Sequence, residues 1–248
     1  MIYFVSDIHL GAGTAEQARR TEDAFCRWLD SIASDVEQLY LLGDIFDFWF
    51  EYERVVPKGC VRVLGRLAEM SRRGVRITFY VGNHDMWCGD YLTEECGVRV
   101  VYAPAVEDLA GRRVHLAHGD NLNIKDKPML RLMNGCFRSS VARWLFKWLI
   151  HPDLALKFGH WWSGKSRKSH GSEPITPAML DFLVRYAREH RTQNTDVSLY
   201  IFGHMHLGYL LRDAECDLLF LSDWSGREAT YATMDADGKT ELKTFEIL

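Results

Sequence analysis

Seven side chains that can bind metal ions follow shortly after apolar runs of the sequence. Short apolar runs that close with a glycine or a polar turn are typical of buried β-strands. These runs occupy residues 2–5, 38–42, 77–81, 114–117 and 199–202. The possible ligands that follow them are Asp7, His9, Asp44, Asn83, His118, His204 and His206.

Each of these residues taken alone has an ordinary structural explanation. A single histidine is more often a hydrogen-bonded surface or core residue, and an aspartate after a strand often caps a helix. Their shared position favours a site, because ligands in open α/β sheets gather at the carboxyl ends of the strands. Most of the seven also stand near a glycine, which lets the backbone turn sharply and direct a side chain inward. We therefore expect the five strands to bring these side chains together around Asp44.

The residue types predict a site with two metal ions. Three oxygen donors and four imidazoles are too many for one tetrahedral zinc ion. They suit two divalent ions about 3.5–4 Å apart that share a bridging carboxylate. A set of nitrogen and oxygen donors without thiolates favours manganese, iron or zinc over calcium. Two such ions acidify a bound water and neutralise a phosphoryl group, so the predicted chemistry is hydrolysis of a phosphate ester or anhydride.

The segments between the strands predict an α/β fold. Residues 18–32 carry apolar side chains at helical spacing and connect the first two strands as a βαβ unit, which implies a parallel pair. A second helix is predicted to begin at Pro57 and to stop at Gly74. Residues 98–102 predict a short strand, and residues 106–117 predict a hairpin.

The C-terminal part predicts one more helix, over residues 177–190, followed by several short strands. Asp237 and Gly238 mark the turn of the last hairpin. We expect these strands to form a second sheet that packs on the first.

Residues 121–170 differ from the rest of the chain in charge and composition. They hold ten Lys or Arg against two Asp, a local charge of +8, whereas the remainder has 20 basic and 32 acidic residues, or −12. They also hold four of the eight tryptophans. The net charge of −4 gives no electrostatic reason to expect nucleic acid as a partner.

Apolar and basic residues alternate at helical spacing over the same residues, 121–170. This pattern predicts an amphipathic helical insertion in a single domain of 248 residues, with breaks at Gly135 and Pro152. Because the insertion stands between two ligand motifs, it could cover the site as a cap. A helical layer that packs on the sheet and exposes its basic face to solvent is the alternative. The aromatic residues at 46–50 similarly favour core packing over the wall of an acyl pocket.

The sequence also indicates the cellular compartment of the protein. The six cysteines form no Cys-x-x-Cys pair, and the first strand begins too early to leave room for a targeting peptide. No apolar stretch reaches the ~20 residues that span a bilayer. We therefore expect a cytoplasmic protein with reduced thiols, which would meet a membrane only at its surface.

The ligand motifs resemble the signature of the calcineurin-like metallophosphoesterases, in order and spacing, over nearly the whole chain outside the insertion. The matching motifs are Asp7-x-His9, Gly43-Asp44-x-x-Asp47, Gly82-Asn83-His84-Asp85, His118 and Gly203-His204-x-His206. The resemblance implies a β-sandwich flanked by helices. It also implies a first metal ion held by Asp7, His9, Asp44 and His206, and a second held by Asp44, Asn83, His118 and His204. His84 would then act on the phosphate or the leaving-group oxygen, and Asp85 would orient His84 through a hydrogen bond.

Within this family, residues 42–49, the His118-Gly119-Asp120 motif and the basic, aromatic insertion look like one branch. That branch cleaves UDP-2,3-diacylglucosamine to UMP and 2,3-diacylglucosamine 1-phosphate in lipid A biosynthesis. The resemblance implies two Mn²⁺ ions, a nucleotide-sugar lipid as substrate, and peripheral association with the inner membrane. The residues implied to contact substrate are Asn83, His84, Asp126, Lys165 and His204.

One residue departs from the best-known members of this branch, which carry arginine at the position of His84. Histidine at this position is the general residue of the family. A different calcineurin-like phosphodiesterase or a nucleotide phosphatase is therefore an alternative function. A metal-free interaction module that kept the fold and lost the site is a second alternative.

Overall fold

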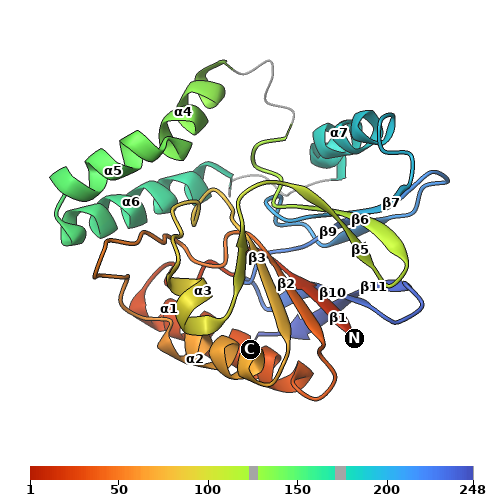
Figure 1. Ribbon diagram of the computed structural model, residues 1–248, viewed down its shortest axis with the longest axis horizontal. Helices are drawn as coiled ribbons and strands as arrows, with labels where there is room; N and C mark the ends of the chain where they lie inside the picture. The colour runs from red at the N-terminus through yellow and green to blue at the C-terminus, as the bar shows by residue number, and fades with distance from the viewer. Residues whose placement is uncertain (123–127, 171–176, 248) are drawn as a thin grey trace.

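The computed structural model describes residues 1–122, 128–170 and 177–247 of the chain. Two β-sheets stack face to face, and helices cover their outer faces (Figure 1). The first sheet contains, in spatial order, β11 (Thr240–Glu246), β10 (Glu228–Met234), β1 (Ile2–Val5), β2 (Gln38–Leu42), β3 (Arg76–Tyr80) and β4 (Arg99–Val101). The second contains β5 (Ala105–Leu109), β6 (Arg112–Ala117), β7 (Val197–Phe202), β9 (Asp217–Phe220) and β8 (Tyr209–Leu211).

Alternating side chains divide the core between the two faces of each sheet. In β1, Ile2 and Phe4 face the space between the sheets, whereas Tyr3 and Val5 face the helices. The outer face of the first sheet is covered by α1 (Ala15–Ile32), α2 (Val61–Arg72) and α3 (Tyr91–Cys96). The outer face of the second sheet is covered by α7 (Asp181–Arg191), which a 3₁₀ turn at Pro177–Leu180 precedes. The predicted α/β sandwich flanked by helices is confirmed.

The central strands of each sheet run parallel, which places their carboxyl ends at one edge. Strands β1, β2, β3 and β4 are parallel to one another in the first sheet, and β6, β7 and β9 are parallel to one another in the second. The predicted hairpin is β5 with β6, and Asp237 and Gly238 lie in the turn between β10 and β11. Both sheets therefore deliver loops to the same end of the sandwich.

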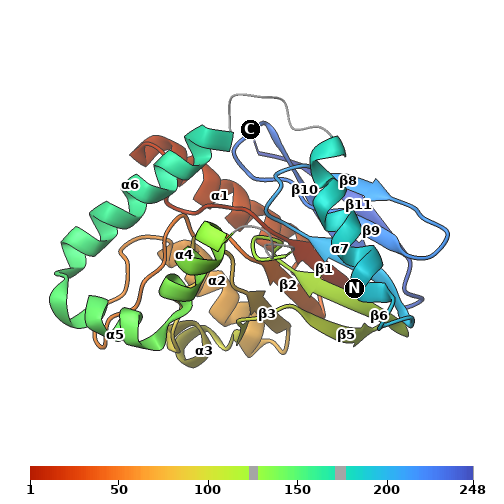
Figure 2. The ribbon, with the colours of Figure 1, turned by 90° about the horizontal axis from the view of Figure 1, so that it is seen from above.

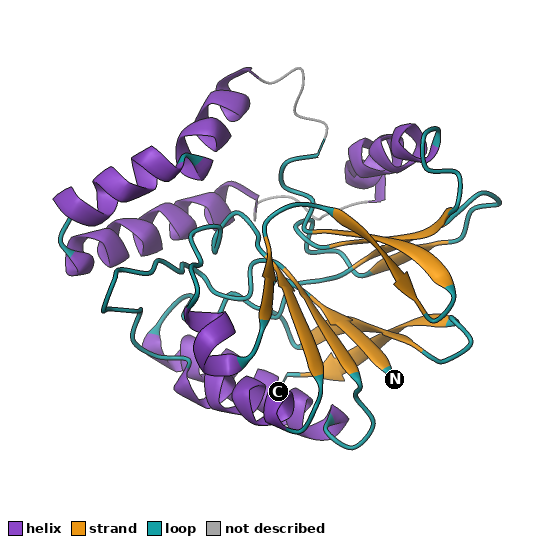
Figure 3. Cartoon of the chain, in the orientation of Figure 1, coloured by secondary structure: helices purple, strands orange, loops and turns teal. Residues whose placement is uncertain are grey.

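The described residues of the predicted insertion, 128–170, form α4 (Pro128–Arg138), α5 (Ser140–Leu149) and α6 (Pro152–His170). Figures 1 and 2 show them together at one side of the sandwich, beyond the ends of the parallel strands of the first sheet. The secondary-structure colouring of Figure 3 separates this helical group from the helices that cover the sheets. Among the residues that the structure describes, no helix combines the length and apolarity needed to cross a bilayer.

Three sequence predictions about the elements are wrong. Helix α2 begins at Val61 rather than Pro57, because Gly59 and Cys60 take positive φ angles and keep the preceding turn non-helical. Helix α4 runs through Gly135, and the break comes at Ser139, whose side chain caps α5 by accepting from the Ala142 amide.

The third concerns the C-terminal strands, which do not all belong to the second sheet. Strands β8 and β9 join it, but β10 pairs antiparallel with β1 and extends the first sheet together with β11. Ala232 and Met234 of β10 lie in the core between the sheets, so this pairing buries them.

Candidate active site

The structure brings all seven predicted ligand side chains together at the carboxyl ends of β1, β2, β3, β6 and β7. Six of them, together with His84, fall into groups of three whose ligand atoms all lie within 4.8 Å of one another. These groups are Asp7 with His9 and His206, His9 with Asp44 and His84, and Asp44 with His118 and His204. Asn83 completes the set, since its Oδ1 lies 3.3 Å from Nε2 of His118.

Backbone hydrogen bonds continue between the loops beyond the strand ends and fix their positions. The amides of Asp7 and His9 donate to the carbonyls of Gly43 and Asp44, both at 3.0 Å. The Gly203 amide donates to the carbonyl of His118, also at 3.0 Å. These hydrogen bonds join the loops that carry the candidate ligands in pairs.

Five of the seven candidate ligands adopt left-handed backbone conformations. They are Asp7 (φ 54°), His9 (φ 51°), Asp44 (φ 52°), His204 (φ 68°) and His206 (φ 54°). Such a conformation costs a non-glycine residue about 1–2 kcal/mol, and strain of this kind is concentrated at functional sites. The expectation that neighbouring glycines make the turns is therefore only part of the answer, because the ligands themselves also turn the chain.

The motif glycines have a second purpose, which is to leave room for ligands from other strands. A Cβ atom on Gly43 would lie 2.5 Å from Nδ1 of His118, and one on Gly82 would overlap Oδ1 of Asp44. A Cβ on Gly203 would lie 2.6 Å from Oδ2 of Asp7. The close approach of these backbones is therefore a condition for assembling the site.

Replacing Gly43 by alanine is expected to displace His118 and to reduce metal binding at the site. Gly74→Ala is the matched control, since Gly74 also has a positive φ (96°, against 85° for Gly43) but has no atom within 4 Å of the position that a methyl group would take. Both variants should lose stability from backbone strain, whereas only Gly43→Ala should lose metal. Thermal unfolding together with metal analysis separates the two effects, and equal metal content in both variants would contradict the prediction.

The spacing of the ligand atoms fits divalent ions. Nε2 of His9 and Nε2 of His206 lie 3.4 Å apart, and Nε2 of His206 lies 3.3 Å from Oδ1 of Asp7. Nε2 of His118 lies 3.3 Å from Oδ2 of Asp44. Ligand atoms about 2.0–2.2 Å from one ion would stand at such separations from each other. Buried ring nitrogens that face each other and a carboxylate at these distances can share a bound cation.

Burial and charge set the protonation of these groups. Burial raises the pKa of Asp44, but the imidazoles of His118 and His84 outweigh it and hold this pKa well below its usual range. Burial lowers the pKa of His9 to about 4 and that of His204 to about 3. For His206, burial is outweighed by the hydrogen bond to Asp7, which raises its pKa to about 9. The ionised carboxylate and the neutral imidazoles of His9 and His204 are the forms that bind a metal ion.

Two imidazoles are oriented through their second ring nitrogen. Nδ1 of His118 lies 2.9 Å from the carbonyl oxygen of Leu42, and Nδ1 of His84 lies 2.9 Å from the carbonyl oxygen of Asp47. In both cases the ring donates its Nδ1 proton, which directs Nε2 into the site. Nε2 of His84 then lies 3.8 Å from Oδ2 of Asp44.

The structure corrects the expected contact between Asp85 and His84. The carboxylate of Asp85 is fully buried and accepts backbone amide protons of Gly82 (2.7 Å) and Ile45 (2.7 Å). It also accepts from the amides of Asp44 and Phe46, both at 3.3 Å. Amide donors of two loops surround this carboxylate, so Asp85 joins the β2 and β3 loops, whereas the Asp47 carbonyl orients His84.

Several contacts near the site are not evident from the sequence. Asp47 belongs to the Gly43-Asp44-x-x-Asp47 motif, but the motif alone does not indicate what Asp47 does. Its buried carboxylate accepts a hydrogen bond from the Ser163 hydroxyl, and Oδ2 lies 3.4 Å from Nδ1 of His160. Oδ2 of Asp223 lies 3.7 Å from Nδ1 of His206. The Asp47 motif was a usable signal, but nothing in the sequence linked Ser163 to it.

The other two residues that were predicted to contact substrate are Asp126 and Lys165. Asp126 falls outside the described residues, and Lys165 lies within α6.

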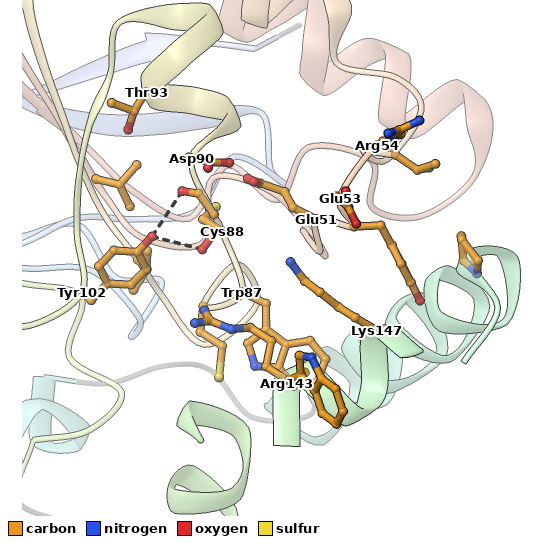
Figure 4. Close-up of a pocket in the computed structure, with 18 of the residues that line it drawn as sticks. Glu51, Glu53, Arg54, Trp87, Cys88, Asp90, Thr93, Tyr102, Arg143 and Lys147 are labelled. Atoms are coloured by element: carbon orange, nitrogen blue, oxygen red, sulfur yellow. Dashed lines mark hydrogen bonds between the residues drawn. The ribbon is translucent and has the colours of Figure 1, made fainter. Parts of the chain in front are cut away.

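A large pocket lies between α5 and the loops that follow β2 and β3. Its volume is about 1400 Å³. Figure 4 shows Arg143 and Lys147 of α5 close to Trp87, with Glu51 and Glu53 of the loop after β2 among the other lining residues. The aromatic residues at 46–50 behave mainly as core, as predicted: Phe46, Trp49 and Phe50 are buried. The Phe50 ring also contacts Phe146 of α5, with centroids 5.1 Å apart, and thereby joins the body to the insertion.

Comparison with known proteins agrees with this site. Residues 1–208 match the family model described as calcineurin-like phosphoesterase. A UDP-2,3-diacylglucosamine hydrolase of Porphyromonas gingivalis is 38% identical over 94% of this chain and 94% of its own length. Proteins of the same name from Haemophilus influenzae and Aeromonas hydrophila are 26% and 31% identical, over 96% and 89% of both chains respectively. The chain therefore belongs to the calcineurin-like phosphoesterase family.

Proposed function

We propose that this protein hydrolyses the diphosphate of UDP-2,3-diacylglucosamine to UMP and 2,3-diacylglucosamine 1-phosphate, with two bound Mn²⁺ ions. The observation that carries the proposal is the convergence of seven ligand side chains from five strands on Asp44. The names of the relatives supply the substrate. As a member of its family the chain is a metal-dependent hydrolase, which argues against the metal-free interaction module.

We propose that the ligand atoms act as two sets that share Asp44. Asp7, His9, Asp44 and His206 would hold one ion, and Asp44, Asn83, His118 and His204 would hold the other. When bound, a pair of such ions neutralises phosphoryl charge and supplies an acidified water. Asn83, His84 and His204 border this site and are proposed to contact the substrate phosphate, with Asp126 and Lys165 as further contacts.

His84 is proposed to act on the phosphoryl or leaving-group oxygen. Its Nδ1 proton is committed to the Asp47 carbonyl, so Nε2 is the nitrogen that faces the site. A proton held on Nε2 can be donated to an oxygen that gains charge as the bond to phosphorus breaks. Asp85 supports this arrangement indirectly by fixing the loops that carry Asp44 and His84.

The insertion at about 121–170 is proposed to act as a cap that receives the acyl chains. The pocket between α5 and the body is larger than the roughly 300–1,000 Å³ that is usual for small-molecule sites, at about 1400 Å³. Phe137, Trp144 and Trp148 line its cap side, and Trp87 lines its body side. An aromatic wall in addition to a phosphoryl-binding site suits a substrate that joins a diphosphate to two acyl chains.

The outer face of the cap is proposed to hold the enzyme at the inner-membrane surface. Apolar side chains exposed on α4, α5 and α6, apart from those that line the pocket, form the insertion's apolar face: Met129, Leu132, Val141, Leu145, Leu149, Leu154, Phe158, Trp161 and Trp162. Exposed patches of this extent mark interaction surfaces. The local charge of +8 would attract anionic lipids, and this attraction would weaken with salt.

Replacing Leu149 by glutamate is expected to release the protein from vesicles that contain phosphatidylglycerol. Leu149 is 75% exposed on the insertion's apolar face, and Val61 on α2 is 73% exposed on the body, so Val61→Glu is the matched control. Loss of an inserted leucine should weaken binding at least about tenfold, whereas Val61→Glu should not weaken it. Vesicle sedimentation at low and high salt gives the measurement. Equal binding by both variants would show that this face does not meet the membrane.

Substrate preference tests the proposed function against the alternative. His84, in place of the arginine of the best-known members of the branch, leaves room for a broader phosphodiesterase or nucleotide phosphatase. We expect kcat/KM for UDP-2,3-diacylglucosamine to exceed that for bis(p-nitrophenyl) phosphate and for UDP-glucosamine without acyl chains. Comparable values for all three substrates would favour the alternative.

A further inference from the structure

We propose that helix α6 of the insertion positions His84, so that the insertion takes part in catalysis as well as in substrate binding. The inference rests on the proposed role of His84. It adds Ser163 as a positioning residue, with Gly159 permitting the close approach of the helix.

Ser163 closes a small hydrogen-bonded ring on the Nδ1 side of His84. Its hydroxyl donates to the carboxylate of Asp47, and its oxygen lies 2.7 Å from Nδ1 of His84. That same nitrogen lies 2.9 Å from the Asp47 carbonyl oxygen. Ser163 is 1% exposed. The single Nδ1 proton therefore has two neighbouring acceptors, and the imidazole plane is fixed by groups from both the body and the insertion.

The docking of α6 depends on close contact with the loop that follows Asp44. Gly159 is buried, and a Cβ atom at this position would overlap the ring of Phe48. His160 contacts the same loop, with Nδ1 3.4 Å from Oδ2 of Asp47. Residues 159, 160 and 163 share one side of the helix, because positions one turn apart lie above each other. One face of α6 thus rests on the residues that adjoin the bridging carboxylate.

This geometry separates two roles of the insertion. A cap that only binds acyl chains would matter for the lipid and not for a small phosphodiester. A helix that fixes His84 matters for every substrate, because the same imidazole acts on each phosphoryl group. Hydrolysis of bis(p-nitrophenyl) phosphate, which has no acyl chains, therefore isolates the positioning role.

The test is a double-substitution cycle with Mn²⁺-loaded protein and bis(p-nitrophenyl) phosphate. We expect Ser163→Ala to lower kcat about tenfold with KM and metal content unchanged, and Ser163→Thr to restore most of the loss. In a His84→Ala background, Ser163→Ala should have no further effect. Equal losses in both backgrounds, or a loss confined to the lipid substrate, would overturn the positioning role.

A pair of glycine substitutions provides a second measurement. Gly159→Ala should lower kcat for the small phosphodiester by displacing α6, whereas Gly135→Ala on α4 has no atom within 4 Å of the added methyl group and should leave it unchanged. Equal kcat values in the two variants would contradict the inference. If His84→Ala alone left kcat unchanged, the proposed role of His84 would fail first, which distinguishes the two failures.

Discussion

Asp44→Ala is expected to abolish hydrolysis and to remove both metal ions together. Asp44 belongs to two of the groups of candidate ligand atoms, one that contains His9 and one that contains His118. Its carboxylate is 2% exposed, and the basic groups that lie within 4.0 Å of it are the imidazoles of His9, His84 and His118. In the proposed arrangement, removing it would take a bridging ligand and a buried negative charge from both ions at once.

Metal analysis and turnover of the purified variant give the measurement for Asp44. Asp108→Ala is a suitable control, because Asp108 lies on β5 with a side chain that is 77% exposed. The control should keep both ions and full activity. If Asp44→Ala kept one ion at full occupancy and turned over within about tenfold of wild type, Asp44 would not be the bridge.

His84→Ala is expected to lower kcat by about 10²–10⁴ with metal content unchanged, the range typical for loss of a general acid or base. The alternative role for His84 is that of a metal ligand, because His84 also belongs to a possible ligand group with His9 and Asp44. The hydrogen bond of its Nδ1 to Asp47 fits either role.

The ratio of metal content to activity decides between these roles. His151→Ala is the control for histidine loss, since its side chain is 70% exposed at the start of α6. It should change neither quantity. A fall in metal content that matches the fall in rate for His84→Ala would make His84 a ligand instead.

The clustering of the candidate ligand side chains could be predicted from the sequence because its determinants are local. Each short apolar run forms a strand, and parallel strands must bring their carboxyl ends together. The alternation that places Phe4 between the sheets and Val5 against the helices is equally local, so the layered fold followed. The left-handed backbone of Asp7 and His206 did not follow, because such conformations are held only by the surrounding tertiary structure.

Contacts between segments that are distant in the sequence could not be predicted from the sequence pattern. The hydroxyl of Ser163 meets Asp47 across 116 residues, and no periodicity of either segment encodes that pairing. The pairing of β10 with β1 likewise depends on which open strand edge is available. The expected partner of Asp85 was wrong because its carboxylate accepts hydrogen bonds from four backbone amides. Backbone amides belong to every residue type, so the sequence does not single these four out.

Product analysis tests the central claim most directly. The Mn²⁺-loaded protein would be incubated with UDP-2,3-diacylglucosamine, and the products identified by mass spectrometry, with Asp44→Ala as the inactive control. We predict UMP and 2,3-diacylglucosamine 1-phosphate in equal amounts, formed only by the wild-type protein. An intact substrate under conditions in which the protein hydrolyses bis(p-nitrophenyl) phosphate, or release of UDP in place of UMP, would contradict the proposed function.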